Sequence, residues 1–179
     1  MDTVRTAGAG LAGTALDAWR SYLQSHASIV RQLDGELVVE HGMTSRDYEV
    51  LLYLAQAENR KLPMSALSER TMLTRSGITR LIDGLVACGL IERVSCESDA
   101  RVSYAQLTDA GYEKLRAAGR THIAGIRRLF LTHFSEEEID TLASLLSRLP
   151  GAAPGGTCSV DETEPGCAVS DADTACAVD

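Results

Sequence analysis

The sequence lacks the features that mark several large classes of protein. It has no apolar run of the ~18 residues that a membrane-spanning helix needs, so we expect no association with a membrane. Its first residues carry no basic segment followed by an apolar one, so we expect no signal peptide and a cytoplasmic protein. No nucleophile motif, glycine-rich phosphate loop or pair of catalytic carboxylates is present, which argues against an enzyme.

Cysteine and histidine occur without the spacing of a disulfide framework or a metal site. Cys88 and Cys96 lie in the body of the chain, and the other three of the five cysteines lie near its end. An odd number of cysteines without a signal peptide argues against a secreted, disulfide-bonded domain. The four histidines are scattered, with no H-x-x-x-H pair and no C-x-x-C pair beside them.

Basic residues are missing from residues 151–179, which hold six acids. Subtracting these six from the 25 acids of the chain leaves 19 acids against 17 bases in residues 1–150, so most of the net charge of -8 belongs to the tail. The tail is rich in Gly, Pro, Ala and Ser and has no periodic apolar face, so we expect it to be disordered.

Periodicity and capping residues predict a mainly α-helical body. Apolar positions three or four residues apart predict a long helix within residues 11–40. Thr44 with Asp47, and Ser135 with Glu138, match the capping box that begins a helix. Further helices are expected over residues 64–72 and 74–90, the second with Thr74 as its N-cap. Thr108 is expected to cap a long helix of roughly 25 residues, with Phe130 and Phe134 in register.

Two segments alternate polar and β-branched residues instead, at residues 90–97 and 101–107, and predict a β-hairpin. A helical pair followed directly by a two-stranded hairpin is the pattern of a winged helix-turn-helix domain.

The helix predicted over residues 74–90 has two separate faces. With Arg75 at zero on a helical wheel, Thr79, Ser76 and Arg80 fall within about 140° of it. Its apolar residues fall between about 240° and 340°. Arginines and short polar side chains suit a DNA major groove, because arginine makes bidentate contacts to guanine edges or phosphates. The alternative is the solvated face of an ordinary surface helix.

The tip of the hairpin carries Asp99 and Arg101, two residues apart. In an extended chain their side chains point to the same side, so the carboxylate could hold the guanidinium outstretched for a narrow minor groove. The alternative is a polar turn with a weak surface ion pair.

Residues 67–115 resemble the DNA-binding core of the MarR family of bacterial transcription regulators. The matching motifs are "LTRSGITRLIDGL", "GLIER", "SDAR" and "LTDAGYEKL", and with the flanking helices the resemblance covers about residues 11–150. The resemblance implies a homodimer that binds double-stranded DNA through two recognition helices and two wings. Repression of transcription is the usual activity in this family, so the resemblance also implies a repressor. Carried over by position, the residues that face DNA would be Thr74, Arg75, Ser76, Thr79 and Arg80, with Asp99 and Arg101 as the wing pair.

The resemblance also divides the chain into functional segments. These are a flexible start (1–10), an N-terminal dimerisation helix (11–43), the winged helix-turn-helix lobe (44–108), the C-terminal dimerisation helices (109–150) and the acidic, cysteine-containing tail (151–179).

Members of this family typically release DNA when a small aromatic or phenolic ligand binds between the dimer arms and the DNA-binding lobe. The candidates for lining such a cleft are Trp19, Tyr22, His26, Met43 and Tyr48. The alternative is that these residues form the core of the dimer.

Three other hypotheses concern what the protein senses or binds. Oxidation of Cys96 could disturb the wing, whereas Cys88 is expected to be buried and inert. Zinc is a possible effector if the fold gathers Glu40, His41 and His122, and the three tail cysteines are a second possible metal site. A winged helix can also serve as a protein-interaction module.

Overall fold

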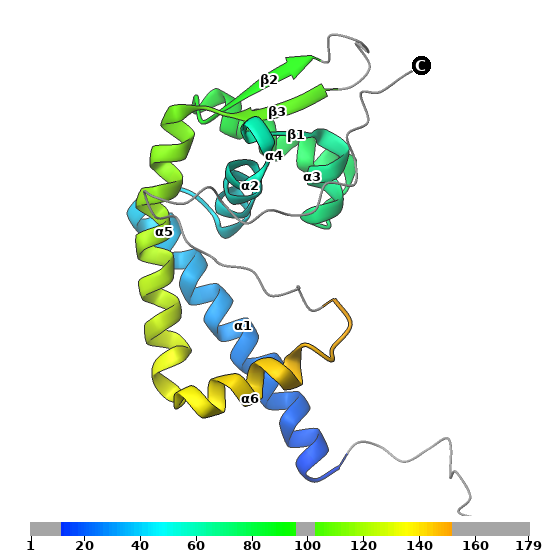
Figure 1. Cartoon of the computed structure of the whole chain (residues 1–179), viewed down its shortest axis with the longest axis vertical. Coiled ribbons are helices and arrows are strands. Elements are labelled where there is room, and N and C mark those ends of the chain that lie inside the picture. Colours follow the sequence, from blue (N-terminus) through cyan, green and yellow to red (C-terminus); the bar gives the residue numbers. More distant parts are fainter. Residues whose placement is uncertain (1–11, 96–102, 152–179) are drawn as a thin grey trace, which may run out of the picture.

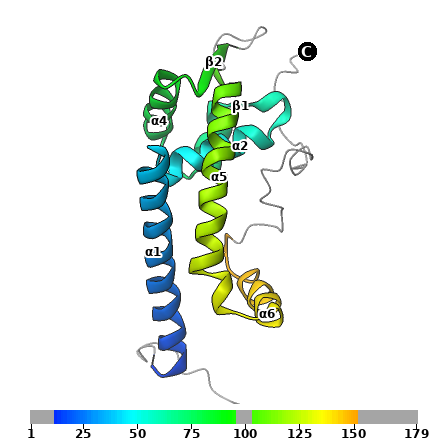
Figure 2. The ribbon, with the colours of Figure 1, turned by 90° about the vertical axis from the view of Figure 1, so that its left-hand side faces the viewer.

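The computed structural model describes residues 12–95 and 103–151 and consists of one lobe from which two long helices extend (Figure 1). The long helices, α1 (Thr14–His41) and α5 (Asp109–Leu129), lie side by side and run in opposite directions (Figure 2). A further helix, α6 (Glu136–Leu146), follows the far end of α5. The lobe contains α2 (Ser45–Gln56), α3 (Met64–Arg70) and α4 (Arg75–Ala87), which confirms the mainly helical fold.

The wing belongs to a three-stranded antiparallel sheet. Its order is β1 (Lys61–Pro63), β3 (Ser103–Leu107), β2 (Ile91–Ser95), with Lys61 opposite Gln106 and Ile91 opposite Leu107. The sequence predicted only the hairpin of β2 and β3. It missed β1 because this strand is three residues long and ends in a proline, which lacks a backbone donor and is tolerated only at a sheet edge.

The predicted helix starts are confirmed by their caps. Thr44 and Asp47 form a complete capping box at α2, as do Ser135 and Glu138 at α6. The end predicted for α5 was wrong, because Phe130 leaves the helical conformation with φ −129° and a short 3-10 turn (Leu131–His133) follows. Phe134 is extended, since the chain must turn there to let Ser135 cap α6.

The core lies within the lobe and is almost entirely aliphatic. Its fully buried side chains come from every helix of the lobe and from the neighbouring ends of α1 and α5, and include Leu37, Leu51, Leu54, Leu67, Ile78, Ile82 and Leu115. Along the described part of α1 and α6, by contrast, most apolar side chains stay exposed. No helix in residues 12–95 and 103–151 is both long enough and apolar enough to cross a membrane.

The start of α5 is joined to the segment between α4 and β2 through one carbonyl group. The Leu90 carbonyl oxygen accepts from the backbone amide of Thr108 at 3.1 Å, while the Thr108 hydroxyl caps Gly111 at 2.9 Å. Gly111 is buried, and a Cβ atom there would lie 2.1 Å from the Leu90 oxygen. Only glycine therefore lets α5 approach the base of the wing this closely.

We expect Gly111→Ala to lower the free energy of unfolding by about 1–3 kcal/mol, because the new methyl group meets backbone that cannot move aside easily. Gly84→Ala is the matched control, since a Cβ atom at that helical position meets nothing within 4 Å. It should be neutral or raise stability by about 0.5–1 kcal/mol. Urea unfolding of both variants checks this, and an unchanged midpoint for Gly111→Ala would contradict it.

Candidate nucleic-acid interface

The two faces of α4 are separated in the structure as the sequence predicted. Ile78, Ile82 and Leu85 are buried in the core. On the opposite side, all five predicted contact residues are exposed and line one open surface groove together with Asp83, namely Thr74, Arg75, Ser76, Thr79 and Arg80. The structure therefore gathers short polar groups and two arginines over the N-terminal part of α4.

Arg75 and Arg80 keep their guanidinium groups available. Within the part of the chain that the structure describes, neither forms an ion pair with an acid. An unpaired guanidinium offers its planar array of donors to an external acceptor such as a base edge or a phosphate. The groove can thus bind an anionic partner without first breaking an internal salt bridge.

Thr74 also has a local role. It is the N-cap of α4, and its hydroxyl accepts from the Gly77 amide at 3.2 Å and lies 3.2 Å from the Ser76 hydroxyl. The cap leaves other amides of the first turn without a helical partner, and such amides attract phosphate.

The turn between α3 and α4 is held by hydrogen bonds from both sides. Arg46 of α2 donates to the Thr71 carbonyl at 3.0 Å, and the Ser68 hydroxyl donates to the Leu73 carbonyl at 2.6 Å. Between them Met72 lies in the left-handed region with φ 52°, and its side chain is 89% exposed. These bonds fix the angle at which α4 leaves the turn.

A contact that the sequence analysis missed joins α4 to the wing. Arg93 of β2 donates to the Asp83 carboxylate at 2.8 Å and reaches the Thr79 carbonyl at 3.5 Å. The alternation of side chains along a strand could have predicted this contact. Arg93 lies two residues after the buried Ile91 and so shares its face. Arg93 also lines a second groove with residues of α3, α4 and β3, including Ser65, Ser68, Arg75, Thr79 and Ser103.

The predicted wing pair, Asp99 and Arg101, and the redox candidate Cys96 lie outside the described residues. The expectation that Cys88 is buried was wrong, since this residue is exposed. The reason is its place at the C-cap of α4, beyond the last buried residue, Leu85, where the helix face no longer meets the core.

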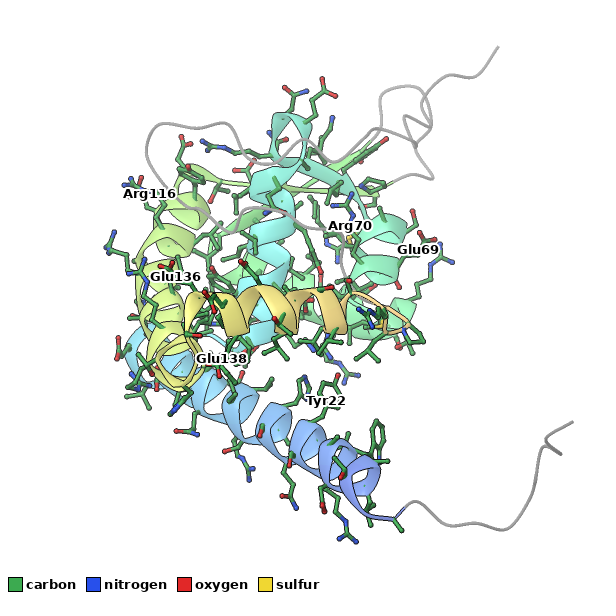
Figure 3. All side chains as sticks on the ribbon, turned by 60° about the horizontal axis from the view of Figure 1, so that its bottom comes forward. Tyr22, Glu69, Arg70, Arg116, Glu136 and Glu138 are labelled. Carbon is green, nitrogen blue, oxygen red and sulfur yellow. The ribbon has the colours of Figure 1, made fainter. Side chains whose placement is uncertain are left out.

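The five candidates for an effector site fall into two groups. Trp19, Tyr22 and His26 form a stacked series along the exposed N-terminal half of α1, with successive ring centroids 6.2 Å apart, and Tyr22 is seen in Figure 3. Met43 and Tyr48 are buried in the core of the lobe. A single chain therefore does not bring all five into one cleft.

The residues considered for zinc are also separated. The Thr121 hydroxyl lies between Glu40 and His41, at 2.8 Å from each. His122 instead packs its ring against Tyr48, with centroids 4.8 Å apart, and burial lowers the pKa of His122, which Glu36 partly offsets. Among the described residues, no three His, Cys, Asp or Glu side chains are placed to share a metal ion.

A helix-turn-helix with exposed arginines on its second helix, followed directly by a β-hairpin, defines a winged helix-turn-helix protein of the DNA-binding class. Comparison with known proteins agrees. The sequence model of the MarR family matches residues 41–102. The repressor YetL of Bacillus subtilis is 28% identical over 117 residues, which are 63% of this chain and 70% of YetL.

Two solved structures from Streptomyces coelicolor are similar over most of their length. AbsC, a MarR family transcriptional regulator, is 32% identical with a TM-score of 0.73, covering 78% of this chain and 93% of AbsC. Sco3205, solved in complex with DNA, is 29% identical with a TM-score of 0.72, covering 78% of this chain and 87% of Sco3205. The chain belongs to the MarR family, and it is a DNA-binding transcription regulator and not an enzyme.

Proposed function

We propose that the protein is a homodimeric repressor that binds a pseudo-palindromic operator and is released from it by a small aromatic or phenolic ligand. The observation that carries the proposal is the groove on α4, where two arginines that form no ion pair with any described residue lie among short polar side chains. Short side chains let the helix backbone approach base edges closely, and each arginine can make a bidentate contact there. The similarity to the repressor YetL supports repression, as opposed to activation, of transcription.

The proposed contacts divide by groove. Thr74, Arg75, Ser76, Thr79 and Arg80 enter the major groove from α4, and Asp99 and Arg101 at the wing tip reach the flanking minor groove. Two subunits place two copies of α4 about one helical turn apart, which sets the half-site spacing.

We expect Arg75→Ala and Arg80→Ala each to weaken operator binding about 5- to 150-fold, the range of a lost bidentate base contact of about 1–3 kcal/mol. The assay is a mobility shift on a site selected from random DNA, at fixed salt. Arg127→Ala is the control, because Arg127 is also exposed and also without an ion pair among the described residues, but lies on α5. Wild-type affinity in both α4 variants, or no DNA binding by the wild type, would favour a protein-interaction module.

The support for a dimer is apolar surface that a single chain leaves uncovered. No residue of α6 is buried, and Figure 2 shows this helix standing apart from α1. Large apolar side chains on the arms are nearly half exposed, at 43% for Leu23, 44% for Val30, 48% for Leu145 and 46% for Leu149. We propose that α1, α5 and α6 of two chains cover one another's apolar faces, as stable dimers do.

We expect the double variant Leu145→Glu/Leu149→Glu to sediment as a monomer at concentrations where the wild type is a dimer, because each glutamate would place a charge in the apolar interface. Met72→Glu is the control. It charges a more exposed apolar side chain, at 89%, that lies in the lobe and away from the arms. A wild-type protein that sediments as a single chain would contradict the dimer.

The support for an aromatic effector is the stacked series on α1. Trp19, Tyr22 and His26 present ring faces at a regular spacing on an exposed helix, and an aromatic ligand can stack on such faces. We place the ligand on these residues, with Met43 and Tyr48 acting through the core of the lobe.

We expect a simple phenolic acid to lower operator affinity of the wild type, and Tyr22→Ala/His26→Ala to bind the operator normally but to lose this response. Phe134→Ala is the control, since Phe134 is an exposed aromatic residue of the arm outside the stacked series. The measurement is a fluorescence-anisotropy titration of labelled operator with and without the acid. An equal response in wild type and double variant would exclude this site.

A further inference from the structure

Asp83 presents a difficulty for a DNA-binding surface. Its carboxylate lines the same groove as Arg75 and Arg80, and its side chain is 61% exposed. An acid in that position repels the phosphates that the two arginines attract. Asp83 would therefore lower the affinity for every DNA sequence, unless a basic partner neutralises its charge or the carboxylate helps to discriminate between sequences.

Arg93 supplies that partner. Its guanidinium crosses from β2 to α4 and donates to the Asp83 carboxylate at 2.8 Å, while 34% of its side chain remains exposed. The same group reaches the Thr79 carbonyl at 3.5 Å, so it contacts α4 one turn further towards the N-terminus as well. Both contacts are made by the Nη2 atom of Arg93, and the shorter, charge-assisted one to Asp83 holds the strand against the helix.

The Arg93–Asp83 pair lies at the point that determines how the wing is oriented relative to α4. Ile91 anchors the start of β2 in the core, and the Thr108–Leu90 contacts anchor the end of β3. Beyond Ile91 the strand β2 loses its support from the core, since Glu92, Arg93 and Ser95 are exposed and Val94 is only half-buried. Among the described residues, the Arg93–Asp83 pair is the ion pair that links the wing to α4.

We propose that Arg93 is a positioning residue, which neutralises Asp83 and fixes the wing relative to α4 so that both elements meet their grooves together. This inference rests on the proposed function of α4 as the recognition helix. An exposed ion pair contributes little to stability, so the pair acts on the arrangement of the DNA-binding elements and not on folding.

The test is a double-mutant cycle of Arg93→Ala, Asp83→Ala and the double variant. It is measured on the selected operator and on random duplex DNA at several salt concentrations. We expect each single variant to lower the ratio of specific to non-specific affinity about tenfold, and the double variant to lower it no further, because both changes remove one interaction. Hydroxyl-radical protection in the DNA flanking each half-site should weaken in all three variants, while the thermal midpoint stays near that of the wild type.

Asp109→Ala is the matched control. It removes an exposed ion pair of similar length, Arg60 to Asp109 at 3.1 Å, and Arg60 directly precedes β1, the edge of the sheet opposite β2. We expect it to leave the specificity ratio unchanged. If it lowers the ratio as much as Asp83→Ala, the effect is general to the lobe and the inference fails.

Direct phosphate binding by Arg93 would give a different result. Arg93→Ala would then reduce the salt slope by about one unit, and Asp83→Ala would raise affinity for all DNA without loss of discrimination. That outcome overturns the positioning role while leaving the proposed function intact. A wild type that fails to select DNA, or one whose binding is unaffected by Arg75→Ala, rejects the proposed function instead.

Discussion

The orientation of α4 about its own axis is the constraint on which the proposed DNA-binding surface depends. Ile78, Ile82 and Leu85 are buried in the core of the lobe, and burying three such side chains is worth several kcal/mol, on the order of 1.5–3 kcal/mol each. Rotating the helix would expose them and bury Arg75 or Arg80 without partners, which costs more. The buried residues of α4 therefore decide which of its side chains face outwards.

Around that helix, hydrogen bonds at both ends set its direction. Arg46 and Ser68 hold the turn before it, and the contact of Leu90 with Thr108 holds the chain after it. The second of these contacts also begins α5, which continues to Leu129 and packs on α1 through Gly125, where a Cβ atom would lie 2.5 Å from Leu33. One continuous helix thus joins the base of the wing to the arms.

What the sequence could predict follows from how local each signal is. Thr44, Thr74, Thr108 and Ser135 mark helix starts through side-chain caps that involve only the next three residues, and all four were predicted. The strand β1 was missed because its pairing with β3 joins residues far apart in the chain. Cys88 was misplaced for a related reason, since a helical wheel does not show where the core stops. The Arg93–Asp83 pair could not be predicted from local signals, because it forms only when the fold brings β2 and α4 together.

The net negative charge of the chain is consistent with DNA binding only when the charges near the binding surface are considered separately from the rest. The net charge is -8, and the groove on α4 contains an acid beside its two arginines. Affinity for phosphates depends on the charges that face the duplex, so a surface with few of them binds non-specific DNA weakly. Discrimination then depends on placing a small number of donors accurately against base edges. In this protein the placement comes from the buried face of α4 and from the ion pair that ties the wing to it, and both are features of packing that net charge does not reveal.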